Sequence, residues 1–244
     1  METVEILGVR VSCLDKHGIL DQAMDWASRR ETRMITYVNA HCINIATQDC
    51  EYRNLLNQMD LVYPDGIGIV WASKFLHQKK LTKVTGREWM DDFCRMMRER
   101  GLSLYILAGA PGIASRARAS IMQRYPATCI AGASDGYFIE KSEMEVLKHI
   151  ETTSPDVLMV GMGVPRQEKW IINHRAEISA PVVWAVGALF DLVSGDRQPV
   201  PDSLNRINLE WLWRLVADPR GKWQRYLIGN PMFIVRVLKQ KYTR

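Results

Sequence analysis

Residues 156–170 read Asp156-Val-Leu-Met-Val-Gly-Met-Gly-Val-Pro-Arg-Gln-Glu-Lys-Trp170, and this stretch decides the fold class. Its continuous apolar run, residues 157–160, predicts a strand that is buried on both faces. The run ends at Gly161-Met-Gly163, and Pro165 suits the first turn of a helix. A strand, a glycine turn and a helix start would direct free backbone N–H groups at an anion. Taken alone, the same pattern is also typical of an ordinary strand-to-helix connection.

Strands and helices alternate along most of the chain. We expect strands at residues 4–9, 34–38, 61–63, 102–107, 129–131, 157–160 and 182–186, with helices between them. This alternation predicts an α/β fold with a mostly parallel, Rossmann-like sheet and helices on both faces. Residues 195–202 contain a glycine and two prolines, and the pattern beyond them is helical only. The sequence therefore predicts an α/β domain over residues 1–194 and a short helical appendage over residues 195–244.

Basic charge is concentrated in the predicted appendage. Residues 195–244 contain ten Lys/Arg and four Asp/Glu, whereas the first 194 residues contain 22 and 23. The appendage also contains Trp211, Trp213, Trp223, Tyr226 and Phe233. Basic residues mixed with such aromatic residues favour an anionic membrane surface or a phosphate-bearing ligand. A nucleic acid and a merely solvated helical layer are the alternatives.

The composition is typical of a soluble globular protein, with 47% hydrophobic and 24% charged residues. No apolar run reaches the roughly 18 residues that cross a bilayer, and we expect no secretion signal. The five cysteines are scattered, and none forms Cys-x-x-Cys. We therefore expect neither a zinc site nor a disulfide framework, and a location in the reducing cytoplasm.

Glycine and polar residues recur where the predicted strands end. In a parallel sheet the carboxyl ends of the strands form the usual ligand-binding edge. We expect these residues to meet at that edge, although each is also an ordinary turn residue. They are Asn39, Asp65, Gly109, Gly112, Asp135, Gly136, Tyr137, Gly161, Gly163, Gly187 and Asp191.

A series of short motifs follows in order along nearly the whole chain. They are Tyr37-Val-Asn-Ala-His41, Tyr63-Pro-Asp-Gly-Ile-Gly68, Thr85-Gly86, Asp135-Gly-Tyr137, Gly161-Met-Gly-Val-Pro-Arg-Gln-Glu168, Glu210-Trp-Leu-Trp-Arg-Leu215, Pro219-Arg220 and Arg225-Tyr226. Together they resemble the WecG/TagA/CpsF glycosyltransferases (glycosyltransferase family 26). The resemblance implies an inverting, metal-independent enzyme that moves a sugar from a UDP-sugar onto a polyprenyl-diphosphate-linked sugar. It also implies action at the cytoplasmic, inner face of a bacterial plasma membrane, in cell-surface polysaccharide biosynthesis.

An inverting transfer needs a general base for the acceptor hydroxyl, worth typically ~10²–10⁴ in rate. Asp65 is the predicted base, because its turn at a strand end exposes the side chain to a cleft; its alternative role is to cap the helix expected at residues 67–76. Asn39 and Gly66 are predicted to contact substrate beside it, and Asn39 is otherwise a turn residue. Tyr37 belongs to the same predicted set. It stands where the family often has Thr, so the identity of the donor does not carry over.

The departing diphosphate must be stabilised as its charge develops. No Asp-x-Asp metal motif occurs in the sequence, and we predict no metal and no cofactor. The predicted substitutes are the helix N-termini that follow Gly109 and Gly112 and that follow Gly161 and Gly163.

Three further side chains are predicted to bind the donor. Gln167 would hydrogen-bond the sugar or phosphate, or would be a solvated residue in the first turn of its helix. Tyr137 would stack on uracil or pack in the core. Asp191 would bind the nucleotide or join a polar network at the edge of the sheet.

Arg214, Arg220 and Arg225 match basic positions of the family's appendage. The resemblance implies that they close over the site and bind the acceptor diphosphate, because a guanidinium can bind phosphate bidentately; the alternative is a set of solvated helix arginines. Residues 228 and 231–238, flanked by Lys239, Lys241 and Arg244, are predicted to lie at the membrane interface. We expect the appendage to be mobile without a membrane, and deletion of residues 195–244 to abolish transfer and leave a folded core.

Two other functions stay open from the residues alone. One is a nucleotide-binding oxidoreductase, although no Gly-x-Gly-x-x-Gly opens the first strand–helix unit. The other is a non-catalytic adaptor that uses the basic tail to bind a membrane or a nucleic acid. The transferase hypothesis includes no nucleic-acid partner, and the resemblance makes a homo-oligomer plausible. UDP-N-acetylmannosamine, its uronic acid and UDP-glucose are all compatible donors, and the acceptor sugar is open.

Overall fold

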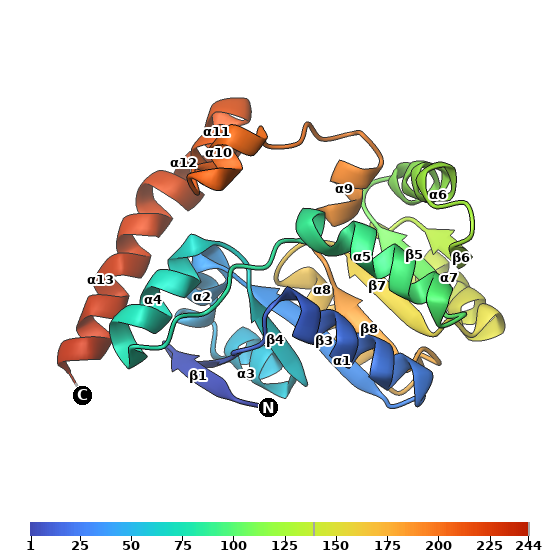
Figure 1. The fold of residues 1–244 in the computed structure, drawn as a ribbon, viewed down its shortest axis with the longest axis horizontal. Coiled ribbons are helices and arrows are strands. Elements are labelled where there is room, and N and C mark those ends of the chain that lie inside the picture. Colours follow the sequence, from blue (N-terminus) through green and yellow to red (C-terminus); the bar gives the residue numbers. More distant parts are fainter. Residues whose placement is uncertain (139, 244) are drawn as a thin grey trace.

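A six-stranded parallel sheet forms the centre of the molecule in a computed structural model, which describes residues 1–138 and 140–243 (Figure 1). The strand order is β4 (Leu61–Pro64), β3 (Arg33–Val38), β8 (Val182–Ala185), β7 (Val157–Gly161), β5 (Ser103–Ala108) and β6 (Cys129–Ser134). Each neighbouring pair in this order is parallel. The predicted α/β fold class is confirmed.

The apolar run in β7 shows why this sheet lies between two layers. Val157 and Met159 pack on one face of the sheet, and Leu158 and Val160 pack on the other. All four side chains are fully buried. Because successive side chains of a strand point to opposite faces, a strand covered on both sides needs an uninterrupted apolar run.

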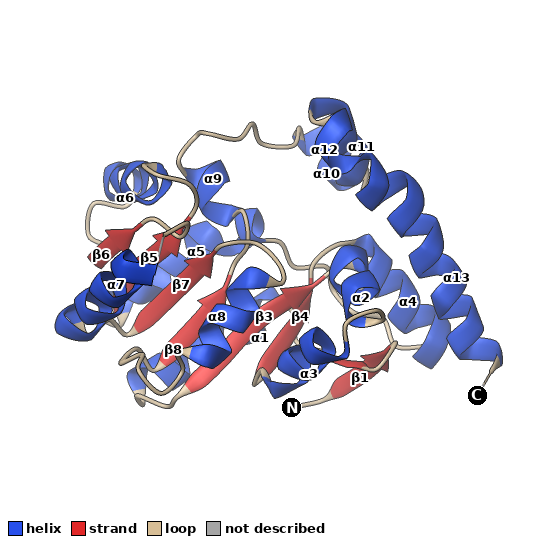
Figure 2. Cartoon of the chain, turned by 180° about the vertical axis from the view of Figure 1, so that it is seen from behind, coloured by secondary structure: helices blue, strands red, loops and turns tan. Residues whose placement is uncertain are grey.

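Helices cover both faces, as Figures 1 and 2 show from opposite sides. One face packs against α1 (Lys16–Ser28), α5 (Gly86–Glu99), α6 (Ile113–Arg124) and α9 (Leu189–Val193), and there the rings of Trp89 and Trp184 stack at 4.7 Å between centroids. The other face packs against α2 (Ala40–Ala46), α3 (Cys50–Gln58), α7 (Glu140–Thr153) and α8 (Arg166–Asn173). Helix α4 (Ile67–His77) extends this second layer.

The predicted strand at residues 4–9 is confirmed at residues 4–6, but it does not continue to residue 9 and does not join the main sheet. The chain instead forms an antiparallel hairpin of β1 (Thr3–Ile6) and β2 (Val9–Ser12), which is a sheet of its own. Leu7 and Gly8 connect the two strands with φ angles of 51° and 81°. A left-handed pair of residues reverses the chain at this point, and glycine adopts that conformation without a steric penalty.

The C-terminal segment is helical, as predicted. It contains α10 (Asp202–Arg206), α11 (Glu210–Ala217), α12 (Pro219–Trp223), a π-helical turn η1 (Gln224–Ile228) and α13 (Gly229–Tyr242). Figure 1 shows that α10–α12 stand above the sheet, at the end of a long connection from α9, and that α13 runs down past α4. Helices α10, α11 and α12 are described in full and bury none of their residues.

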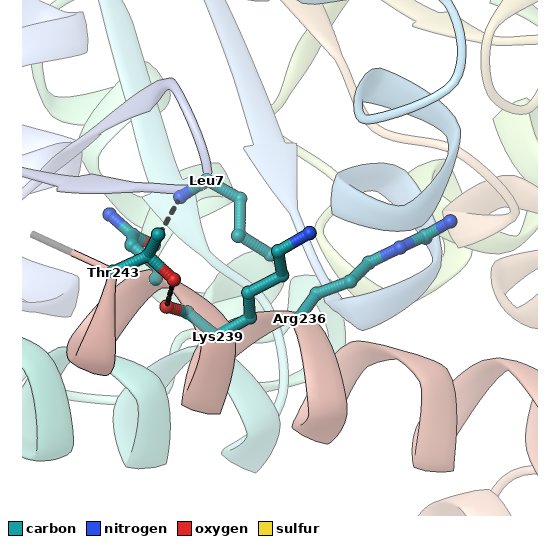
Figure 3. Close-up of a pocket in the computed structure, with 5 residues that line it drawn as sticks. Leu7, Arg236, Lys239 and Thr243 are labelled. Carbon is teal, nitrogen blue, oxygen red and sulfur yellow. Dashed lines mark hydrogen bonds between the residues drawn. The ribbon is translucent and has the colours of Figure 1, made fainter.

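Helix α13 is anchored in the core. Phe233 and Val237 are 2% and 0% exposed and pack with the second face of the sheet. At the far end of the helix, the backbone N–H of Leu7 donates to Gln240 Oε1 at 2.9 Å, beside a shallow hollow of about 280 Å³ (Figure 3). Arg236 Nη1 donates to Oδ1 of a residue on α2, Asn44, at 2.6 Å. Helix α13 therefore belongs to the packed body of the protein.

Within residues 1–138 and 140–243, no helix combines the length and the apolar character needed to cross a bilayer.

Candidate functional site

A cavity of about 650 Å³ lies where β3 and β4 end. One wall consists of Asn39 and the residues that follow it, together with the start of α4 from Asp65 onward. The opposite wall comes from α11, from η1 and from the start of α13. The cavity is therefore enclosed between the carboxyl edge of the sheet and the C-terminal segment.

Asn39 holds Asp65 in place. Its Oδ1 accepts hydrogen bonds from the backbone N–H groups of His41 at 3.1 Å and Cys42 at 3.2 Å, and so caps α2. Its Nδ2 therefore faces the neighbouring strand end and donates to Asp65 Oδ2 at 3.2 Å. Turning the amide over would lose the cap, so the cap fixes the orientation of the donor toward Asp65.

Asp65 does not cap α4. The N-cap of α4 is Gly66, and no side chain donates or accepts a hydrogen bond there. The backbone N–H of Asp65 donates to the carbonyl of Val38 at 2.8 Å and continues the pairing of β4 with β3. Gly66 then turns with φ 104°, a conformation that favours glycine. The carboxylate is thus available to the cavity, which it lines.

The surroundings of Asp65 make it a stronger base than an ordinary aspartate. Burial raises its pKa, and the charge of Glu210 raises it further. The charges of Arg214 and Arg225 and the hydrogen bond from Asn39 lower the pKa, but the net shift is upward. A carboxylate with a raised pKa accepts a proton more readily near neutral pH, which suits a general base.

Cations gather on the side of the cavity that faces Asp65. Arg214 and Arg225 both line it. Burial and the charges of Arg225, Arg197 and Arg214 lower the pKa of Lys222. Burial and the charges of Arg225 and Lys222 lower the pKa of His41 to about 4. Cations that disfavour one another's charge in this way form a site that an anion would stabilise.

Arg225 also has an unused donor. Its Nε is fully buried and has no hydrogen-bond partner in the part of the chain that the structure describes. A buried N–H group without a partner costs free energy unless a ligand accepts from it. Arg225 as a residue lines the same cavity as Asp65, and with Arg214 it gives that cavity positive charge that favours an anion.

Lys83, which the sequence analysis did not single out, fastens the C-terminal segment over the cavity. Its Nζ donates to Asn205 Oδ1 at 3.0 Å, to Asn208 Oδ1 at 3.2 Å and to Glu210 Oε1 at 2.5 Å. Arg87 adds a hydrogen bond to the carbonyl of Val200 at 2.6 Å. The ion pair of Lys83 with Glu210 thus joins α11 to the segment that precedes α5.

Of the three arginines predicted to bind diphosphate, the structure brings two to the cavity. Arg220 lies exposed on α12, outside the cavity lining. Arg214 lines the cavity although its side chain is exposed on α11, so its predicted contact with the diphosphate and its alternative role as a solvated helix arginine both stay predictions. Partial loss of hydration lowers the pKa of Arg214, but Asp65, Tyr226 and Glu210 outweigh this effect and the net shift is upward. The role predicted for Arg220 stays a prediction.

The predicted glycine turns form a second group, beyond β8 on the same edge. The N–H of Gly109 donates to the carbonyl of Gly161 at 3.1 Å. Asp135 accepts from the N–H groups of Gly112 at 3.0 Å and Ala114 at 3.4 Å, at the start of α6. A carboxylate of the protein itself thus occupies part of the helix N-terminus that the sequence assigned to a phosphate.

Tyr137 lies beside these turns and is 49% exposed, so its alternative role in the core is wrong. Its hydroxyl donates to the carbonyl of Met162 at 3.3 Å, and the guanidinium of Arg166 lies 5.0 Å from the ring centroid. Gly163 adopts φ 77° with open space around its Cα. Asp191 is partly exposed on α9. This end of the edge therefore presents an aromatic ring and accessible backbone.

Gln167 is fully buried, so its alternative role as a solvated residue is wrong. Its Oε1 accepts from the N–H of Gly187 at 2.9 Å, and its Nε2 donates to Glu168 Oε1 at 2.7 Å. Thr36 donates to the same carboxylate oxygen at 3.0 Å. Burial raises the pKa of Glu168 to about 7, although the hydrogen bonds from Gln167 and Thr36 lower it. The predicted contact of Gln167 with a donor stays a prediction, and its observed partners tie β3, α8 and the end of β8 together.

Tyr37 lies between the two groups. Its hydroxyl packs against Gly187, where any side chain would collide with it. Burial raises the pKa of Tyr37 well above its usual value, and the charges of Cys42, Glu168 and Asp65 add to the effect. Adjacent strands lie about 4.8 Å apart, so the three steps from β4 to β7 span about 14 Å. Asp65 and the glycine turns are thus two ends of one extended edge.

The described residues do not group as metal ligands. Across residues 1–138 and 140–243, no three His, Cys, Asp or Glu side chains lie together in a way that could hold a metal ion. The cationic side chains that line the cavity are those of Arg214 and Arg225, together with His41 when it is protonated.

Comparison with known proteins agrees with the motifs. The model of the glycosyl transferase WecG/TagA/CpsF family matches residues 4–244. The chain is 28% identical over 242 residues to the N-acetylglucosaminyldiphosphoundecaprenol N-acetyl-beta-D-mannosaminyltransferase of Staphylococcus aureus strain MRSA252, covering 98% of this chain and 93% of the relative. The protein of the same name from strain NCTC 8325 / PS 47 matches with the same identity and coverage.

Proposed function

The chain belongs to the WecG/TagA/CpsF family of glycosyl transferases, and on this premise we propose that it transfers a hexosyl or N-acetylhexosaminyl group from a UDP-sugar to a polyprenyl-diphosphate-linked sugar. The reaction inverts the anomeric centre and needs no metal. The name of the relatives supports the acceptor class, since it describes transfer to a sugar on diphosphoundecaprenol. Neither the oxidoreductase hypothesis nor the adaptor hypothesis finds support in this family.

Asp65 acts as the general base. It removes the proton from the acceptor hydroxyl, the oxygen attacks the anomeric carbon, and UDP departs from the opposite face of the sugar. The observation that carries the proposal is a carboxylate that Asn39 orients into a cavity whose facing wall bears Arg214 and Arg225. Guanidinium groups stabilise the charge of diphosphates without the help of a divalent ion.

The donor lies along the carboxyl edge of the sheet. Its uracil stacks on the exposed ring of Tyr137, and its ribose lies near Asp191. The diphosphate passes the glycine turns, and the sugar reaches Asp65. The spacing of about 14 Å between β4 and β7 supports this placement, because an extended nucleotide-sugar bridges a distance of that order. The donor-binding residues are Tyr37, Asn39, Gly66, Gly109, Gly112, Tyr137, Gly161, Gly163, Gln167 and Asp191.

The protein binds peripherally to the inner face of the plasma membrane through its C-terminal segment. Exposed apolar side chains of η1 and α13 support this, among them Leu227 at 57% and Ile228 at 46%. Lys239 and Lys241 lie farther along, near the end of α13, and would face anionic lipids. Arg244, predicted to join them, lies outside the described residues.

The test is the substitution Asp65→Asn, which keeps the shape of the side chain and removes the base. We expect transfer to fall by about 10²–10⁴-fold while UDP-sugar binding and thermal stability stay near wild type. Asp21→Asn makes the same chemical change at an exposed carboxylate on α1 and is the matched control. Transfer should be measured with a panel of UDP-sugars in the presence and absence of a chelator. An active D65N enzyme would place the base elsewhere, and loss of transfer with chelator would overturn metal independence.

A further inference from the structure

The cavity lining has two chemically different parts. Asp65 at the end of β4, Arg214 on α11 and Arg225 on η1 form the charged part. Ile67 and Trp71 on α4 and Ile234 on α13 form the apolar part. A ligand that fills the whole cavity must therefore carry both a negative charge and an apolar group.

The apolar residues form a groove between α4 and α13 whose walls are held by packing. Its base is the contact of the two helices, where a Cβ added at Gly68 would lie 3.5 Å from the ring of Phe233. Trp71 stacks on Phe75 at 5.5 Å and meets the edge of Phe233 at 6.4 Å between centroids, which fixes its ring. Above this base, Ile67, Trp71 and Ile234 are 42%, 36% and 44% exposed.

We propose that this groove binds the first isoprene units of the lipid-linked acceptor, directly beyond its diphosphate. The proposal rests on the proposed function, since it needs the diphosphate to lie at Arg214 and Arg225. Charge complementarity sets the direction: the anionic end meets the arginines, so the chain that leaves it runs along the apolar wall. Each isoprene unit that leaves water for this wall should raise affinity by roughly tenfold, because burial of apolar groups is favourable.

The groove is distinct from the surface that would touch a membrane. Val235 follows Ile234 on α13 and is 63% exposed, but it does not line the cavity. A residue one step along a helix is rotated by about 100°, so the two side chains face different surroundings. Substitutions at Ile234 and at Val235 can therefore distinguish binding of the lipid chain from binding to a bilayer.

The experiment uses the full-length enzyme without membranes or detergent. Acceptors carry the same sugar diphosphate and end in a methyl group or in one, two or three isoprene units. For each enzyme we compare kcat/KM for the two-unit acceptor with kcat/KM for the methyl acceptor. In wild type this ratio should be roughly 100. In Ile234→Ser and Ile67→Ser it should fall several-fold or more, and in Val235→Ser it should stay at the wild-type value.

A binding measurement separates failure of this inference from failure of the proposed function. Calorimetry with geranyl diphosphate and with methyl diphosphate, without donor, should show tighter binding of the former to wild type than to Ile234→Ser. A wild-type enzyme that uses the methyl acceptor but shows no gain from added isoprene units would overturn the groove and leave the transfer intact. Equal losses in Ile234→Ser and Val235→Ser would also overturn it. Tail-dependent binding without transfer from any UDP-sugar would overturn the proposed function instead.

Discussion

The two parts of the C-terminal segment are both helical but opposite in their relation to the core. Helix α13 inserts Phe233 and Val237 into the apolar layer beneath the sheet. Helices α10–α12 bury none of their residues and are held mainly by polar contacts from Lys83 and Arg87. Yet α11, in this second part, supplies Arg214 to the cavity. Helix α13 therefore supports the fold and also lines the cavity, whereas α11 contributes to the cavity without being buried.

Helix α13, which begins at Gly229, packs with the core although it lies within the predicted appendage of residues 195–244. Whether a chain cut at residue 195 folds stays a prediction, as does the division into two domains. Such a cut also removes α13 from the core, and the burial of Phe233 and Val237 argues for a cost in stability.

The largest expected effect is on stability. Its absence would contradict the difference in anchoring between α13 and α10–α12. Phe233→Ala should lower the free energy of unfolding by about 3–5 kcal/mol, because it leaves a cavity in the core. Trp223→Ala, at a side chain that is 45% exposed on α12, should change it by no more than about 0.5 kcal/mol. Denaturant unfolding of both variants tests this. Similar losses would mean that the two parts are equally anchored.

The second effect is on catalysis. Arg214→Ala should lower kcat/KM for transfer by about 10–100-fold, the loss expected when a charge-assisted hydrogen bond to a diphosphate disappears. Arg220→Ala should have a smaller effect, because Arg220 lies outside the cavity lining. Melting temperatures should match wild type in both. If the two losses in kcat/KM are equal, the segment closes further during the reaction and brings Arg220 to the diphosphate.

A third pair of substitutions separates the two anchors. Asn44→Ala removes the hydrogen bonds from Asn44 Nδ2 to the carbonyl of Gly229, at 2.6 Å, and from Arg236 to Asn44 Oδ1. It should cost about 1–3 kcal/mol. Lys83→Met releases α10 and α11 only. Hydrogen exchange should therefore rise in α13 for N44A and in α10–α11 for K83M. The same exchange pattern in both variants would show that the segment moves as one body.

The smallest expected effect is a shift in pH dependence. In the proposed mechanism, transfer needs Asp65 deprotonated, so kcat/KM should fall as the pH drops through its pKa, which burial raises. The charge of Arg214 lowers this pKa, so Arg214→Met should move the fall to higher pH. The pH profile of R220M serves as the reference. An unshifted profile in R214M would show that Arg214 does not act on the base.

Strand β7 and the residues at the strand ends show what could be predicted. An apolar run with glycines after it is a local signal, and it correctly predicted a strand covered on both faces. Asp65 and Asn39 were expected to meet, because the ends of parallel strands share an edge. Asn39 Nδ2 lies 3.2 Å from Asp65 Oδ2. The hairpin of β1 and β2 was missed because its turn has one glycine and one Leu at positive φ, which β-propensity does not reveal.

Long-range pairing explains the other differences at the candidate site. Gln167 is buried because Gly187 and Glu168 satisfy its amide, although a first-turn glutamine usually faces water. Asp135 occupies the start of α6, which the glycine pattern alone assigned to phosphate. Lys83 was overlooked because its partners are more than 120 residues away, and no local pattern connects them.

The sequence by itself determined the alternation of strands and helices, the order of the motifs and the position of the basic segment, because periodicity and composition act over a few neighbouring residues. Only the tertiary structure decided that Arg214 and Arg225 face Asp65, that Arg220 does not, and that α13 belongs to the core. The physical reason is that burial and charge pairing depend on which surfaces meet when the chain packs. Side chains of the same type, such as Arg214 and Arg220, therefore lie inside or outside the cavity lining according to how the chain packs.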